Sequence, residues 1–306
     1  MPSESSGLDR KSVLRQFDRR VAVPDPADWL LREVESRMFE RLELIRIEPA
    51  CIVDVGCGLG AGLRSLSQRW PQAQAVGIDL SPRRAARAAA FQEAPLDSGL
   101  RRLLRQLSAS RRTGPQACPP HYLAADTHAL PFAADSVDLL WSNLAFPWLD
   151  DPPAAIAEWY RVLRPGGLLM FTALGVDSFA GLRAAGLHLP EWPDLHNVGD
   201  ALVSAGFADP VMDTERLTVT WSEPAALLAD LRALGGNALQ SRTQGLITPA
   251  QRARRLDALC AQLRPEGEDA PMTLGVELVY GHAWIGPRKP RRDGWVPVSF
   301  QPSRPA

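Results

Sequence analysis

The amino-acid sequence predicts an α/β fold in which a mostly parallel β-sheet is covered by helices on both faces. Short apolar runs stopped by glycine or aspartate, such as Cys51–Gly56 and Ala75–Asp79, are typical of strands buried on both faces. Segments with helical periodicity separate these runs at the spacing of βαβ units, and parallel neighbours need such crossover helices. In this architecture a ligand is expected at the carboxyl ends of the strands.

The individual elements follow in order along the chain. Apolar residues recur at three- and four-residue steps over 27–46, which predicts a helix that ends before Pro49. The helices expected after it begin near Gly60, at Pro82 and at Pro153. The later strands are expected at Tyr122–Ala125, Val137–Ser142, Leu168–Ala173, Val211–Trp221 and Met272–Ile285.

Three segments organise the chain. We expect an N-terminal helical segment over 1–48, one catalytic domain over 49–286, and a loosely held tail rich in proline and arginine over 287–306. Two insertions interrupt the domain. Residues 83–118 predict an arginine-rich surface helix followed by a loop, and residues 223–264 carry two helical patterns that are placed to cap the site.

Composition excludes several classes of function. The chain has 306 residues, 45% of them hydrophobic, and a formal net charge of -1, so no general attraction to nucleic acid or to an anionic membrane is expected. No apolar run is long enough to cross a bilayer. The four cysteines form no CxxC pair, which predicts neither a metal site nor a disulfide framework and favours the cytoplasm.

The most informative motif is DVGCGLGAG, from Asp54 to Gly62, between the first strand and its helix. Glycine at such a turn lets the backbone approach a ligand closely, because a Cβ would collide or forbid the dihedral angles. About twenty residues later Asp79 closes the second strand, where a carboxylate can accept hydrogen bonds from both ribose hydroxyls of an adenosine group. This spacing fits several nucleotide cofactors, NAD among them.

Polar and aromatic residues follow the next strands. Asp126 comes after the third strand, where it either binds a ligand or caps the following turn. Asn143 comes after the fourth, where it either lines the reaction site or satisfies backbone groups. Three aromatic residues close by would either surround a cationic group or belong to the core: Trp141, Phe146 and Trp148.

Together, DVGCGLG, GIDLS, AADTHALPF, DLLWSNL and RVLRPGGLLMFT resemble the ordered motifs of class I methyltransferases that use S-adenosylmethionine (SAM). The resemblance covers about residues 50–175. It implies a Rossmann-like sheet of seven strands whose last strand is antiparallel, and a glycine loop beneath the methionine part of SAM. The cofactor-binding residues that it implies are Asp54, Gly56, Gly58, Gly60, Asp79, Leu80, Asp126, Thr127 and Asn143.

A narrower resemblance spans nearly the whole chain. FDRRVA, WSNLAFPWLDDPPAAIAEWYRVLRPGG, FTALGVDSFAGLR and LLADLRALGGNAL are similar to the malonyl-acyl-carrier-protein O-methyltransferases of biotin synthesis. This resemblance implies a carrier-protein or CoA thioester as substrate. The arginines of the 83–118 insertion would then suit docking of an acidic carrier protein, with a solvated helix face as the alternative.

Carboxylate methylation agrees with the absence of an evident catalytic base. A malonyl carboxyl group, with a pKa of about 3 to 4, is ionised at neutral pH, so the enzyme has to align the carboxylate and hold it with a cation. The catalytic residues stay unassigned, with Asn143, Arg161 and Arg242 as candidates. The arginines that could clamp the carboxylate are Arg19, Arg20, Arg161, Arg183 and Arg242.

Other functions fit parts of the sequence. The respiratory complex I assembly factors that hydroxylate an arginine are similar through LREVESRMFERL and the VSF near the end. An NAD-dependent oxidoreductase is permitted by the spacing from the glycine motif to Asp79, and a methyltransferase for another small carboxylate or metabolite stays open. Nucleic-acid methylation is disfavoured, because the sequence after Asn143 lacks paired prolines and no cysteine follows a proline.

Overall fold

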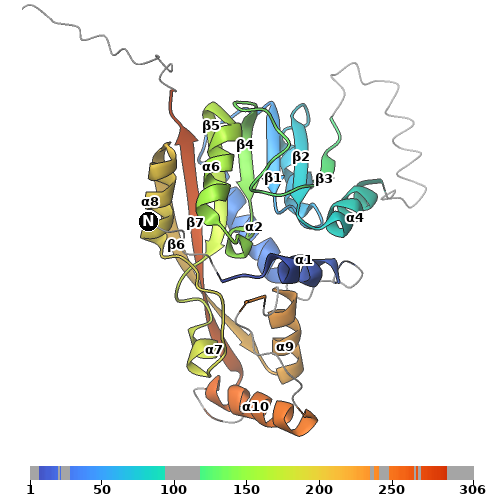
Figure 1. Cartoon of the computed structure of the whole chain (residues 1–306), viewed down its shortest axis with the longest axis vertical. Coiled ribbons are helices and arrows are strands. Elements are labelled where there is room, and N and C mark those ends of the chain that lie inside the picture. Colours follow the sequence, from blue (N-terminus) through green and yellow to red (C-terminus); the bar gives the residue numbers. More distant parts are fainter. Residues whose placement is uncertain are drawn as a thin grey trace, which may run out of the picture.

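The computed structural model describes residues 7–19, 21, 28–93, 118–234, 238–240, 248–264, 267 and 270–287. Its centre is a seven-stranded sheet in the order β3-β2-β1-β4-β5-β7-β6 (Figure 1). The strands are β1 (Cys51–Val55), β2 (Gln74–Asp79), β3 (His121–Ala124), β4 (Val137–Ser142), β5 (Leu163–Leu174), β6 (Phe207–Trp221) and β7 (Met272–Ile285). The predicted α/β class is therefore confirmed.

The direction of each strand follows from its pairing. Strands β1 to β5 pair in parallel, whereas β7 is antiparallel to both of its neighbours, β5 and β6. The last strand in the chain is thus the antiparallel one, as the resemblance implied. The strand order reverses at β1, which lies between β2 and β4, so the loops after β1 and β4 diverge and leave a crevice there.

Helices cover both faces of the sheet (Figure 1). They are α1 (Arg10–Asp18), α2 (Asp28–Glu43), α3 (Ala61–Arg69), α4 (Pro82–Glu93), α6 (Pro152–Val162), α7 (Ala180–Ala184), α8 (Leu195–Ala205), α9 (Pro224–Ala233) and α10 (Pro249–Gln262), with a short 3-10 turn η1 (Phe146–Trp148). Apolar residues of α2 and α3 pack in one cluster with Ile52, while those of α6 and α8 pack in another with Val53. Adjacent residues of β1 therefore serve opposite faces, which explains the continuous apolar run.

Two strands begin earlier than their apolar runs indicate. Strand β5 starts at Leu163 instead of Leu168, and its register with β4 shifts between Val137 and Leu139. Strand β6 starts at Phe207 instead of Val211, with a shift between Ala208 and Val211. The shift in β6 has the one extra residue of a β-bulge, whereas the shift in β5 is a longer irregularity.

The 223–264 insertion contains α9 and α10, which lie beside the lower half of the long β6–β7 pair (Figure 1). Between them, Leu239 forms a β-bridge with Leu8, so this segment contacts the N-terminus. Of the 83–118 insertion the structure describes α4 and Cys118, and residues 94–117 lie outside the description, as does the predicted tail from 288 onward. No helix in the described ranges combines the length and apolarity that a membrane crossing needs.

Candidate functional site

A cavity of about 210 Å³ opens where β1, β2 and β4 end. Eight of the nine residues predicted to bind a cofactor line it, because the carboxyl ends of these parallel strands meet at one edge of the sheet. They are Asp54, Gly56, Gly58, Asp79, Leu80, Asp126, Thr127 and Asn143. Gly60, the ninth, does not line the cavity.

The glycine loop after β1 forms the floor of the cavity. Gly56, Gly58 and Gly60 all have positive φ angles, of 75°, 55° and 76°. A Cβ on Gly56 would lie 2.3 Å from the Cβ of Ala145, so this position needs glycine for space as well as for conformation. A Cβ on Gly60 would lie 2.4 Å from the ring of Tyr122. Gly60 therefore allows the loop to pack against β3.

Asp79, at the end of β2, is held rigidly at the cavity wall. Its side chain is buried, with Oδ2 accepting the Gly58 N–H at 2.9 Å and Oδ1 accepting the Ser81 N–H at 2.8 Å. Burial raises the pKa of Asp79, while the Arg84 guanidinium and these two hydrogen bonds act against the rise. Each carboxylate oxygen keeps a second lone pair, so the group can still accept hydrogen bonds from a diol.

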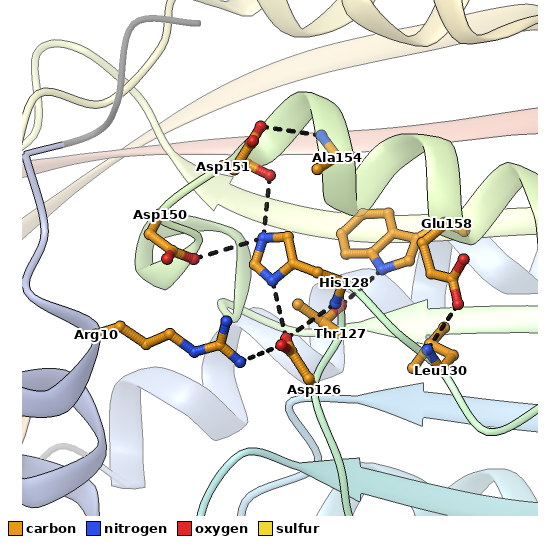
Figure 2. A network of polar contacts seen from close by, with 10 residues as sticks. Arg10, Asp126, Thr127, His128, Leu130, Asp150, Asp151, Ala154 and Glu158 are labelled. Carbon is orange, nitrogen blue, oxygen red and sulfur yellow. Dashed lines mark hydrogen bonds and ion pairs between the residues drawn. The ribbon is translucent and has the colours of Figure 1, made fainter.

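Asp126, which follows β3, belongs to a polar network at the edge of the cavity (Figure 2). Its carboxylate forms an ion pair with Arg10 of α1 and accepts the backbone N–H of His128 at 3.0 Å, and the His128 Nδ1 lies 2.9 Å from Oδ1. Burial opposes ionisation, but the hydrogen bonds from His128 and Arg10 outweigh it and lower the pKa of Asp126. The capping role predicted for Asp126 is therefore present, and its side chain also lines the cavity.

Two neighbours of this network anchor it to the rest of the fold. The His128 Nε2 lies 3.0 Å from the carbonyl oxygen of Asp151 and 3.5 Å from Oδ1 of Asp150 (Figure 2). The Thr127 hydroxyl accepts a hydrogen bond of 2.8 Å from the indole N–H of Trp159 on α6. The cavity wall at 126–128 is therefore fixed to α6 and to the turn that precedes it.

Asn143 joins two elements behind the cavity. Its Nδ2 donates to the carbonyl of Leu31 on α2 at 3.0 Å, and its Oδ1 accepts from the Thr172 hydroxyl on β5 at 2.9 Å. The side chain thus satisfies backbone and core groups while it lines the cavity. Of the three aromatic candidates, Trp141 and Trp148 line the cavity, whereas Phe146 lies in the core and stacks on Phe171.

Of the five predicted arginine clamps, the three that the structure describes do not line the cavity. Arg161 is bonded to Glu158 and to the carbonyls of Leu130 and Phe132, and it does not line the cavity. Arg183 donates to three carbonyls and stacks on Trp192, and Arg19 ends α1 without lining the cavity. Arg20 and Arg242 lie outside the described residues.

Three other arginines line the cavity instead: Arg10, Arg32 and Arg84. Sequence reasoning did not assign them to the site. It missed Arg10 because it assigned no separate helix before residue 27, whereas Arg32 and Arg84 lie in predicted helices whose inner faces the sequence did not orient toward the site. Helix α1 places Arg10, Val13, Leu14 and Phe17 on the cavity, a spacing of three and four residues that would have revealed its inner face. Phe17 contacts Trp148 edge-on at 5.3 Å, and the Arg84 guanidinium lies 4.6 Å above the ring of Phe17.

Comparison with known proteins places this site in a family. Residues 53–171, which contain the glycine loop, Asp79 and Asp126, match a methyltransferase domain family. A malonyl-[acyl-carrier protein] O-methyltransferase of Laribacter hongkongensis is 41% identical over 99% of this chain and 100% of its own length. The chain belongs to the malonyl-[acyl-carrier protein] O-methyltransferase family. Two further members are similar over nearly their whole length. The protein from Gallionella capsiferriformans is 40% identical over 94% of each chain, and that from a Methylovorus species is 36% identical over 99% of this chain and 98% of its own length.

Solved structures confirm the fold of this family member. The YcgJ protein of Bacillus subtilis superposes with a TM-score of 0.56 at 14% identity, covering 84% of this chain and 100% of that protein. A Bacillus halodurans protein described as a methyltransferase candidate superposes with a TM-score of 0.55 at 13% identity, covering 83% and 99%. At such low identity the likeness concerns the fold alone.

Proposed function

We propose that this chain is the O-methyltransferase that transfers the methyl group of SAM to the free carboxylate of malonyl-acyl-carrier protein, or of malonyl-CoA, in biotin precursor synthesis. One observation carries the proposal beyond family membership: Asp79, the glycine loop and Asp126 line a single cavity at the carboxyl ends of neighbouring strands. This is the arrangement that an adenosyl group requires. All four cysteines are free thiols, which fits a cytoplasmic enzyme.

The residues present fit an adenosyl sulfonium compound. Asp79 would accept the ribose hydroxyls, Asp126 and Thr127 would lie at the adenine, and Gly56 and Gly58 would let the backbone contact the methionine part. When bound, SAM supplies an electrophilic methyl group: the substrate carboxylate oxygen forms a new C–O bond while the S–CH₃ bond breaks with its electron pair left on sulfur. No proton moves in this reaction, so the site needs no general base.

The work of the chain is therefore alignment and charge placement. The ring of Trp148 and the apolar side of α1 exclude water from the cavity, which strengthens electrostatic interactions inside it. Arg32 is exposed on α2 and lines the cavity, which makes it the best placed cation for the substrate carboxylate. We assign it this role in place of the arginines selected from the sequence.

A methyl-transfer assay, together with tests of arginine hydroxylation and NADH binding, separates the alternative functions. Purified protein is incubated with methyl-labelled SAM and malonyl-acyl-carrier protein, malonyl-CoA, or a panel of small dicarboxylates, and the products are analysed by mass spectrometry. We expect one methyl group on the malonyl carboxylate. Label on a small carboxylate alone would support the broader metabolite methyltransferase. Absence of transfer together with hydroxylation of a protein arginine would support the assembly-factor alternative, and binding of NADH instead of SAM would refute the proposal.

A further inference from the structure

A short stretch of the 223–264 insertion forms a β-ladder with the residues in front of α1. Leu239 makes an antiparallel bridge with Leu8. The Gln240 backbone N–H donates to the Gly7 carbonyl at 2.8 Å, and the Gln240 Nε2 donates to the Leu8 carbonyl at 2.9 Å. Leu8 and Gln240 are 232 positions apart along the chain. The ladder is therefore a tertiary contact between the N-terminus and the insertion.

The ladder continues directly into α1. The backbone N–H of Asp9 donates to the Ala238 carbonyl at 2.7 Å. The Asp9 side chain caps the helix, because it accepts the backbone N–H groups of Lys11 and Ser12 at 3.1 and 3.3 Å. Helix α1 begins at the next residue, Arg10, so no free residue separates the ladder from the first helical turn. The ladder thus fixes where α1 begins.

Apolar side chains close the same junction. Phe17 and Trp148, which both line the cavity, pack against a small cluster of buried residues. The members of this cluster are Leu8, Val13, Ala238 and Leu239. Leu239 itself does not line the cavity. It can therefore influence the cavity only through its neighbours on α1 and in η1.

Helix α1 also contacts the residues proposed to hold the adenosyl group. Arg10 forms an ion pair with Asp126 (Figure 2), and Asp18 accepts a hydrogen bond from the Ser81 hydroxyl, two residues after Asp79. The helix is thus attached to the insertion through the ladder and to the cofactor side of the cavity through its own polar side chains.

The insertion reaches the cavity separately, at the end of α9. Leu234 lines the cavity and packs in one apolar cluster with Leu31 and Leu174, which line it as well. Leu31 precedes Arg32, the residue assigned to the substrate carboxylate. The same insertion therefore contacts the proposed substrate side at Leu234 and the start of α1 at Leu239.

We propose that Leu239 and Gln240 are positioning residues that couple substrate binding to cofactor binding through α1. A ligand that orders one side of this connected unit leaves less ordering to be done by the second ligand, so the two bind with positive cooperativity. The coupling is equal in both directions, because it is a difference in binding free energy. This inference rests on the proposed function, and it gives a role to residues of the insertion that no motif singled out.

The test measures binding of S-adenosylhomocysteine by calorimetry, with and without malonyl-CoA. This pair cannot react, because S-adenosylhomocysteine has no methyl group to transfer. For the wild-type protein we expect saturating malonyl-CoA to lower the Kd for S-adenosylhomocysteine about fivefold or more. For Leu239→Ala we expect this ratio to fall below about twofold. Leu239→Met keeps the apolar volume and should restore the coupling.

Matched variants separate coupling from a loss of stability. Leu259 on α10 is as buried as Leu239, each with 6% exposure, but it belongs to the main core cluster and not to the ladder. Leu259→Ala should lower the melting temperature as Leu239→Ala does and yet keep the coupling. Gln240→Ala removes one hydrogen bond from an exposed side chain, so it should stay folded and lower the ratio without abolishing it. Gln262→Ala, exposed on α10, is its control and should leave the ratio unchanged.

Hydrogen exchange gives a second measurement, which needs no acyl substrate. S-adenosylhomocysteine alone should slow exchange of the Asp9 and Gln240 backbone N–H groups, although neither residue lines the cavity. This protection should be lost at Gln240 in Leu239→Ala and kept in Leu259→Ala. Unchanged exchange at both amides in the wild-type protein would refute the connection through α1.

The coupling and the proposed function fail in different ways. If the wild-type protein binds no S-adenosylhomocysteine, the proposed function itself is refuted. If it methylates malonyl-CoA but its Kd for S-adenosylhomocysteine does not respond to malonyl-CoA, only the coupling is refuted. Malonyl-acyl-carrier protein replaces malonyl-CoA in both assays if only the carrier-bound form is methylated. The coupling is also refuted if Leu239→Ala keeps it, or if Leu259→Ala abolishes it as completely as Leu239→Ala.

Discussion

Arg10 forms an ion pair with Asp126, a residue 116 positions further along the chain. The contact fastens α1 to the loop after β3 (Figure 2), and residues of this helix line the cavity. At its other end, Asp18 accepts a hydrogen bond from the Ser81 hydroxyl beside Asp79. The N-terminal helix is therefore attached to both walls that are proposed to hold the adenosyl group.

Loss of the Arg10 contact should loosen α1. We predict that Arg10→Ala lowers the free energy of unfolding by less than about 1 kcal/mol, because both partners are partly exposed. It should nevertheless accelerate hydrogen exchange in α1 and weaken S-adenosylhomocysteine binding severalfold. Lys11→Ala, on the outer side of the same helix, is the control and should change neither measurement. Unchanged exchange in the Arg10 variant would mean that the pair does not hold the helix.

Asp79 should contribute to the affinity for every ligand that carries the ribose. Asp79→Asn replaces one acceptor oxygen by an N–H₂ group that faces the N–H of Gly58 or Ser81. We predict a rise of about tenfold or more in Kd for S-adenosylhomocysteine and methylthioadenosine alike, since both carry the ribose. Asp213→Asn, on exposed β6, is the matched control. Selective loss of only one ligand would contradict the ribose assignment.

Alanine substitutions at two glycines with nearly equal φ angles distinguish the cost of backbone strain from the cost of a steric clash with a neighbouring residue. Gly56 has a φ of 75° and Gly166 a φ of 77°, but a Cβ on Gly166 would meet nothing within 4 Å. Gly166→Ala should cost about 1 kcal/mol and leave ligand binding intact. Gly56→Ala should cost more, because of Ala145, and abolish binding of S-adenosylhomocysteine. Urea unfolding and calorimetry give the two quantities, and equal effects of both substitutions would refute a role for close approach at Gly56.

We expect the buried Asp54 to lower the stability of the ligand-free protein while it contributes to ligand binding. Burial, Glu35 and Asp79 raise the pKa of Asp54 in the folded protein. At a pH between its pKa in the unfolded state and its pKa in the folded state, the folded protein therefore holds a proton that the unfolded chain has released. Stability should therefore fall as the pH rises through this range. Asp54→Asn should raise the melting temperature of the ligand-free protein at neutral pH by about 2–4 °C and flatten this dependence. The same variant should bind S-adenosylhomocysteine more weakly. A lower melting temperature would show that the Asp54 charge stabilises the empty protein.

The exposed arginines of α4 give a test of carrier-protein docking. Arg83 and Arg87 are exposed on the helix that follows Asp79, and the Arg87 guanidinium lies 4.5 Å from the ring of the exposed Phe91. A basic surface speeds encounter with an acidic partner. We predict that Arg83→Glu combined with Arg87→Glu raises KM for malonyl-acyl-carrier protein about tenfold while KM for malonyl-CoA stays the same. The control reverses Arg254 and Arg255, exposed on α10. Equal changes for both substrates would exclude docking on α4.

Regular elements were predicted from the sequence where one physical signal dominates. The bounds of β4 and β7 agree with the apolar runs Val137–Ser142 and Met272–Ile285. Strand β5 was predicted too short because the RPGG turn, with Gly166 at positive φ, is an irregular stretch inside the strand. Such interruptions are held by the neighbouring strand, so the local sequence does not reveal whether such a turn ends a strand or continues it.

Some residues of the candidate site were also predicted from the sequence, whereas others were found only from the fold. Motif spacing led to Asp54, Asp79, Asp126 and Asn143, because residues at the ends of parallel strands meet wherever the strands are adjacent. It did not lead to Arg10 or Glu35, and one of its candidates was Arg161, which the fold uses to hold Glu158. A helix in front of the first strand can cover the sheet in several ways that its own residues do not distinguish.

The sequence by itself thus determined the α/β class, the parallel strands, the glycine loop and the acidic residues that follow the strands. These features depend on periodicity and spacing between residues that are close along the chain. Only the tertiary structure decided that α1 covers the cavity, that Arg10 meets Asp126, and that Glu35 joins Asp54 and Trp141 at Gly62. Those contacts arise from the packing of distant segments, whose geometry is set by the whole core and not by any local pattern.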